Sequence, residues 1–194
     1  MSLNTPSIDP SPITGLSFFD DFIGTSRNDF LWAISGVDVA PQDAIGGRLL
    51  VTSTNPASYG EMYLGDKGNF SIAKHAHSIW RGVLTPGNSS AECGIDGAGN
   101  QSTEWICWIT GSPNFRCQCG SGGNTSTINS GVAVDSLDHV FEIYTFTGFA
   151  QFFLDGVFIT TITANVPTTT LQPYVWVVGT GTANMDYVLV QGDR

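Results

Sequence analysis

Charged residues are scarce in this 194-residue chain, and positive ones are the scarcest. The chain has 7 Lys plus Arg against 17 Asp plus Glu, a formal net charge of −10. Charged residues make up 12% of the total, about half of the usual share. Nucleic acids and anionic membranes are both bound through clustered Lys and Arg. Seven positive residues spread along the whole chain argue against nucleic acid as a partner and exclude an anionic membrane surface.

Long apolar runs are also missing. A membrane-spanning helix needs about 20 apolar residues, whereas the longest candidate run here is residues 174–178. Residues 1–15 have neither the basic start nor the apolar stretch of a secretory signal. We therefore predict no transmembrane segment and no signal peptide. The protein would act in the cytoplasm, or reach the outside by a leaderless route, unless a tag has replaced a native leader.

No segment shows the 3.6-residue apolar repeat of a helix, and turn residues recur about every ten residues, which is typical of a β-sandwich. Hydrophobic residues make up 41% and aromatic residues 11%, as in globular proteins. We predict an all-β fold: one two-sheet antiparallel β-sandwich in residues 16–194, after an extended Pro/Ser-rich arm in residues 1–15. Outside the segment described next, strands are predicted at residues 18–23, 30–34, 48–53, 60–64, 70–75, 79–84, 91–95, 103–109, 115–119, 171–178 and 185–191, with a Gly/Ser/Asn-rich loop at residues 120–131.

Residues 137–167 have the clearest local pattern in the chain. Residues 140–146 alternate with a period of two, and residues 150–154 and 157–163 are rich in aromatic and β-branched residues. The pair Asp155-Gly156 between the last two runs is typical of a type I′ turn, which needs positive φ at both central residues. The segment is therefore predicted to form a three-stranded β-meander.

Four short motifs carry a resemblance to a known superfamily. They are the His-Val-Phe-Glu-Ile run from His139, the Gln-Phe-Phe-Leu-Asp-Gly-Val run from Gln151, the Asn-Val-Pro of residues 165–167, and the closing Asp-Tyr-Val-Leu-Val from Asp186. Together they resemble the concanavalin A-like lectin/glucanase superfamily, which includes laminin G-like modules. The likeness is clearest over residues 138–190 and extends to residues 18–22 and Trp32. It implies a two-sheet jelly roll, and because members include enzymes, lectins and structural modules, it does not imply one function.

Glucanases of the superfamily carry a Glu-x-Asp-x-x-Glu strand that places a nucleophile and an acid/base about 5 Å apart. The nearest segment here, residues 92–96, has the single glutamate Glu92 and ends with Asp96 before a Gly-rich turn. The next glutamate along the chain is Glu104. We therefore predict no enzymatic activity.

Tryptophans on a surface with little charge are the candidate binding residues. Trp105 and Trp108 fall on opposite faces of one predicted strand, so one should enter the core and the other should be exposed. An exposed tryptophan beside Glu104 could stack on a sugar ring or lie in a subunit interface, because aromatic residues are also enriched at interface centres. Glu104, Trp105 and Trp108 are therefore the predicted glycan-binding or interface residues, whereas the other tryptophans in apolar strands are predicted to be core: Trp32, Trp80 and Trp176.

Four cysteines lie within residues 93–119, and two registers of the predicted hairpin remain open for them. If Thr110 pairs with Phe115, Cys107 faces Gln118, and the cysteines of the second strand point to the other face. A loop longer by one residue would bring Cys107 opposite Cys117, within reach of a disulfide. Without a leader, small buried thiols are the default expectation.

Metal sites are only weakly indicated. His75 and His77 would share one face of a strand but have no obvious third ligand, and His139 is predicted to be structural. No cofactor is predicted, although calcium is possible because several members of the superfamily bind it near a position resembling Asp186 here. Backbone carbonyls near Asp20 could complete such a site.

Two functions follow from the resemblance and the composition. The chain resembles Gly/Ser/Thr-rich, acidic modules encoded among bacteriophage structural proteins, which implies a non-enzymatic capsid-decoration, fibre or tail component on the virion surface. It would contact other virion proteins, form a homo-oligomer through residues 1–15 and bind surface glycans. The alternative is a carbohydrate-binding module or lectin, and a glucanase-type glycoside hydrolase is a distant third.

Overall fold

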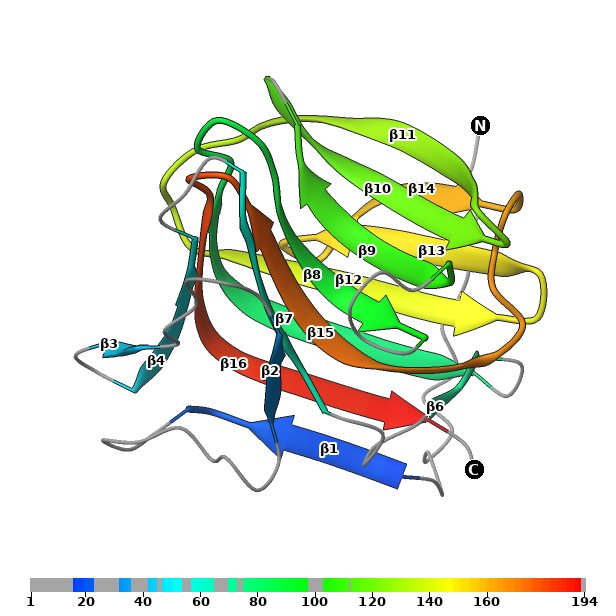
Figure 1. The fold of residues 1–194 in the computed structure, drawn as a ribbon. Helices are drawn as coiled ribbons and strands as arrows, with labels where there is room; N and C mark the ends of the chain where they lie inside the picture. The colour runs from blue at the N-terminus through cyan, green and yellow to red at the C-terminus, as the bar shows by residue number, and fades with distance from the viewer. Residues whose placement is uncertain are drawn as a thin grey trace.

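The computed structural model describes residues 16–22, 32–35, 42–44, 47–53, 57–64, 70–72, 75–97, 103–111 and 113–192. These residues form sixteen β-strands in two antiparallel sheets, and the described part contains no helix that could cross a membrane (Figure 1). The predicted arm of residues 1–15 lies outside the described residues, as do residues 23 and 30–31 of the predicted strands.

The first sheet, which we call sheet A, has the strand order β14-β13-β12-β7-β16-β4-β3, and β1 also pairs with β16. Its strands are β1 (Leu16–Asp20), β3 (Gln42–Ala44), β4 (Arg48–Thr52), β7 (Ala76–Thr85), β12 (His139–Phe146), β13 (Phe149–Leu154), β14 (Val157–Ile162) and β16 (Thr182–Gly192).

The second sheet, sheet B, has the order β11-β10-β9-β8-β15-β5-β2, and β6 also pairs with β15. Its strands are β2 (Ala33–Ser35), β5 (Tyr59–Tyr63), β6 (Phe70–Ser71), β8 (Ala91–Asp96), β9 (Trp105–Thr110), β10 (Asn114–Ser121), β11 (Asn124–Ala133) and β15 (Thr170–Val178).

The predicted all-β sandwich is therefore confirmed. One face of each sheet carries large apolar side chains that are fully buried against the other sheet, because successive residues of a strand point to opposite faces. The largest include Trp80, Trp108, Phe115, Phe141 and Phe152.

The predicted meander is confirmed as β12, β13 and β14, which pair in sequence order. Asp155 and Gly156 have φ values of 52° and 74°, as the type I′ turn requires. The meander occupies one edge of sheet A, where β12 pairs with the long strand β7.

Two strand predictions were wrong. The loop expected at residues 120–131 is mostly strand β11, which pairs with β10 along most of its length; pairing satisfies its backbone although its Gly, Ser and Asn content favours a loop. Of the strand expected at residues 70–75, residues 70–71 form β6, residues 73–74 lie outside the described residues, and His75 has a φ of 69°, which is not extended backbone. The short strand β3 was not predicted.

Candidate functional site

The outer face of sheet B, the face turned away from the core, combines acidic and aromatic side chains from four neighbouring strands. Glu92 of β8 stands beside Trp176 of β15, which in turn stands beside Glu61 of β5. Asp96 lies on the same face as Glu92, because the two residues are an even number of positions apart on one strand. The register thus gathers three carboxylates that are far apart in the sequence.

These three carboxylates have little contact with solvent. Glu61 is 2% exposed, Glu92 is 6% exposed and Asp96 is 7% exposed. Half-buried aromatic residues stand among them: Trp105 is the cross-strand neighbour of Asp96, and Trp176, whose ring lies 6.4 Å from that of Tyr59, stands between Glu92 and Glu61.

Glu92 is the best-defined acid of this face. Its Oε2 accepts hydrogen bonds from the Tyr174 hydroxyl at 3.0 Å and from the Cys107 thiol at 3.8 Å. Burial raises the pKa of Glu92 to about 8 against the lowering effect of these two bonds, and the charges of Asp96 and Glu61 raise it further. Burial also raises the pKa of Cys107 and of Tyr174, so both stay protonated as donors. Glu92 therefore holds a proton at neutral pH.

Gly94 makes this arrangement possible. It lies between Glu92 and Asp96 on the same face, with Cys107 and Tyr174 as its cross-strand neighbours. A Cβ atom at this position would overlap the backbone oxygen of Ile106 and the Cα of Cys107. Because the position has no side chain, the two neighbouring side chains can reach Glu92.

Trp105 lies against the sheet in a fixed orientation. Its Nε1 donates a hydrogen bond to Gln118 Oε1 at 2.8 Å, and Gln118 Nε2 donates to Thr127 Oγ1 at 3.0 Å. A Cβ atom at Gly120 would overlap the indole ring, so the ring rests on the Gly120 backbone. A flat, half-buried ring held in this way suits stacking on a sugar.

The other predicted site residues have different surroundings. Glu104 Oε1 accepts hydrogen bonds from Gly122 N at 2.9 Å and from Ser121 Oγ at 3.2 Å, in the turn between β10 and β11. Trp108 is fully buried and packs edge-on against Phe152 at 5.7 Å, so no ligand reaches it. The role of Trp105 and Glu104 in binding stays a prediction, and Trp108 belongs to the core.

The predictions for the three remaining tryptophans were right in two cases. Trp32 and Trp80 are buried in the core. Trp176 was wrongly expected there: it lies half-buried on the outer face of sheet B, opposite Glu61 and Glu92. The outward direction of Trp176 cannot be recognised from the apolar run around it, because several outward residues of β15 are apolar or buried as well.

The first of the two hairpin registers is the one observed. Thr110 pairs with Phe115 and Cys107 with Gln118, so Cys117 and Cys119 point toward the core while Cys107 faces outward. All four cysteines are free and buried, as expected for structural thiols.

Histidines and the calcium candidates are engaged in protein contacts. His77 stacks on Tyr144 with ring centroids 3.8 Å apart, and His139 Nδ1 lies 2.7 Å from Asp155 Oδ2. Asp186 pairs with Arg81 at 3.3 Å, and Asp20 Oδ2 accepts a bond from the indole of Trp32 at 2.7 Å. No group of three possible metal ligands occurs among the described residues, and calcium stays a prediction.

Comparison with known proteins adds the fold and no more. No family model and no curated protein matches the sequence. Among solved structures, the endo-β-1,3-glucanase from Pyrococcus furiosus matches with a TM-score of 0.67 and 15% identity over 90% of this chain and 93% of the glucanase. The Crh5 transglycosylase in complex with NAG matches with a TM-score of 0.69 and 13% identity over 95% and 88% of the two chains. The carbohydrate recognition domain of Emp47p gives a TM-score of 0.65 and 11% identity over 92% and 95%.

The protein therefore has the concanavalin A-like jelly-roll fold that is shared by these glucanases, transglycosylases and carbohydrate recognition domains. The comparisons give no support to the resemblance to phage modules.

Proposed function

We propose that this protein binds glycans on the outer face of sheet B. The observation that carries the proposal is the placement of Trp105 beside Asp96 and of Trp176 between Glu92 and Glu61, so that two aromatic rings alternate with three buried carboxyl groups. Aromatic rings give a sugar ring a flat apolar contact, and a few fixed polar groups orient its hydroxyls. The solved structures that share the fold include proteins that bind or cleave carbohydrates, which supports this class of ligand.

A binding screen tests this proposal. The probes are β-1,3-linked glucose oligosaccharides, N-acetylglucosamine oligomers and mucin O-glycans, which represent the ligands named for the similar structures. Replacing Trp105 or Trp176 by Ala should weaken binding of the best probe about tenfold or more, which corresponds to about 1.4 kcal/mol. Tyr144→Ala is the matched control, because Tyr144 is a half-buried aromatic residue on the outer face of sheet A. If both tryptophan variants bind the probe as tightly as the wild type does, the outer face of sheet B is not the binding site.

Glycoside hydrolysis or transglycosylation is a second candidate, favoured by the surroundings of Glu92: it is buried beside two neutral donors, and burial raises its pKa to about 8. A carboxylic acid that stays protonated at neutral pH can donate a proton to the oxygen of a leaving sugar. The candidates for the second carboxylate are Asp96, on the same strand, and Glu61, two strands away in the same row at about 10 Å between Cα atoms. This candidate function departs from the prediction of a non-enzyme.

Products from the best-bound glycan, which are new reducing ends for hydrolysis and chains of altered length for transfer, distinguish the two candidates. An enzyme would release them with the wild-type protein and not with Glu92→Gln, whereas the variant would still bind. A wild-type protein that binds without cleavage or transfer would be a carbohydrate-binding module.

The predicted place of the protein, on the surface of a virus particle, stays a prediction. Residues 1–15, through which a homo-oligomer was expected to form, lie outside the described residues. Glycan binding on sheet B is compatible with that place but does not depend on it.

A further inference from the structure

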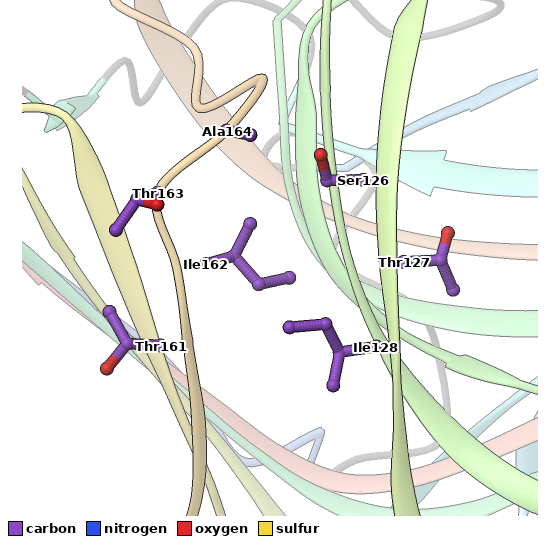
Figure 2. Close-up of a pocket in the computed structure, with 7 residues that line it drawn as sticks. All are labelled: Ser126, Thr127, Ile128, Thr161, Ile162, Thr163 and Ala164. Carbon is purple, nitrogen blue, oxygen red and sulfur yellow. The ribbon is translucent and has the colours of Figure 1, made fainter.

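Strand β11 is the last strand of sheet B, and β14 is the last strand of sheet A. At this side of the sandwich the two strands face each other across a gap. A hollow of about 390 Å³ lies between these strands, and Figure 2 shows the side chains of Ile128 and Ile162 pointing toward one another across it. Ile162 is 3% exposed and Ile128 is 37% exposed, so the apolar interior reaches the surface here. Asn165 Nδ2 donates a hydrogen bond to Ser126 Oγ at 2.9 Å and ties the two strands together beside the hollow.

Both strands are open edges among the described residues, since each pairs on one side only: β11 with β10, and β14 with β13. Soluble proteins usually protect such edges with charged residues, with proline or by keeping them short. The strands at the opposite ends of the sheets follow this rule, because β2 and β3 have three residues each. In contrast, β11 has ten residues and β14 has six, and neither contains a charged residue or a proline.

The charge distribution sets this side of the protein apart. Residues 117–134, which include β11, and residues 156–169, which include β14, contain no Asp, Glu, Lys, Arg or His, although the chain has a net charge of −10. Two copies of a chain with this net charge repel each other, and an uncharged contact surface adds no further like-charge repulsion at close range.

Exposed apolar side chains gather on the same strands. Among the described residues, five large apolar side chains are exposed, and three of them lie on β11 or β14: Ile128, Val157 at 62% and Phe158 at 52%. Phe158 contacts the Phe153 ring at a centroid distance of 5.4 Å and continues an aromatic row on the outer face of sheet A.

We propose that this side, β14 together with the hollow beside β11, is the contact between two copies of this chain. An edge strand can pair antiparallel with its own copy about a twofold axis, which supplies hydrogen bonds to both edges at once. Such pairing covers Val157 and Phe158 and places the uncharged sides of both copies together. This contact is independent of residues 1–15 and of the glycan-binding face.

Sedimentation velocity of the full chain over a roughly hundredfold range of concentration tests the proposal. The wild type should pass from monomer to dimer, and Phe158→Lys should remain a monomer throughout, because a lysine on the edge puts a like charge on both copies. Phe19→Lys is the matched control, since Phe19 is 57% exposed on β1, another edge strand, and this variant should dimerise like the wild type. Ile128→Lys should weaken the dimer as well. Melting curves of each variant, followed by circular dichroism, check that a monomeric variant is still folded.

Salt gives an independent readout. Because the contact is uncharged and the copies repel each other at long range, raising the salt concentration should strengthen dimerisation. A wild type that stays monomeric at every concentration would overturn the proposal. So would a dimer that Phe158→Lys and Ile128→Lys leave intact, or one that only deletion of residues 1–15 dissociates.

Discussion

Glu92 and Glu142 are strand glutamates on the outer faces of opposite sheets, and each lies near a tyrosine, yet their environments differ. Glu142 on sheet A has a side chain that is 17% exposed, and its Oε2 lies 3.3 Å from Nε2 of His77. Glu92 on sheet B is more deeply buried and accepts hydrogen bonds from two neutral donors, Tyr174 and Cys107.

The other charged groups show the same difference between the two sheets. Sheet A also pairs Asp186 with Arg81 and Asp138 with Arg48 at the surface, which is the usual way to accommodate exposed charges. Glu92 has no ion-pair partner among the described residues, and its burial makes the charged form unfavourable. An acid in such surroundings is a candidate for function, whereas the ion pairs of sheet A support solubility and stability.

The largest effect should come from Glu92. The unfolded carboxyl ionises near its ordinary pKa of 4.5, whereas the folded one keeps its proton until about 8, so a rising pH favours unfolding across this window. The free energy of unfolding should fall by up to about 5 kcal/mol between these values, and Glu92→Gln should remove this fall. Urea unfolding at several pH values measures it, with Glu142→Gln as the control that keeps the wild-type slope. If the free energy of unfolding changed with pH in the same way for the wild type and for Glu92→Gln, the buried environment assigned to Glu92 would be refuted.

An intermediate effect is expected on the side of sheet A, at His139. Burial lowers the pKa of this imidazole, but hydrogen bonds and charge from Asp155 and Asp135 outweigh it, so the net shift is upward from 6.5. The stabilisation of the fold by charged His139 is thus complete below pH 6.5 and is lost as the pH rises through the folded-state pKa of this residue. His139→Gln should cost about 1–2 kcal/mol at low pH, because it removes two charge-assisted hydrogen bonds of a buried imidazole, while its two aspartate partners are partly exposed and regain water.

An NMR titration of the imidazole checks the direction of the His139 shift. A midpoint for His139 below that of an ordinary histidine would contradict the prediction.

The smallest effect should come from the pair His77 and Glu142. Their contact is partly solvent-exposed, so a double-mutant cycle of His77→Ala and Glu142→Gln should give a coupling energy of about 1 kcal/mol or less. Thermal or urea unfolding of the four proteins measures it. A coupling several times larger would mean that the His77–Glu142 pair behaves as a buried ion pair, which would contradict the contrast between the two sheets.

Much of the fold could be predicted from local sequence alone. The meander of residues 137–167 was recognisable because alternation of side chains and the Asp155-Gly156 turn are local properties. Strand β11 was missed because its Gly, Ser and Asn content is that of a loop, and only pairing with β10 makes it a strand.

The candidate site was beyond the reach of sequence because it depends on register between distant strands. The sequence determined that Trp105 and Trp108 face opposite ways along one strand. Tertiary structure alone decided which tryptophan is outward, that Trp176 is not in the core, and that Glu61 and Tyr174 stand near Glu92. The physical reason is that side-chain direction along one strand follows from the pleat, whereas neighbours across a sheet follow from how the whole chain pairs.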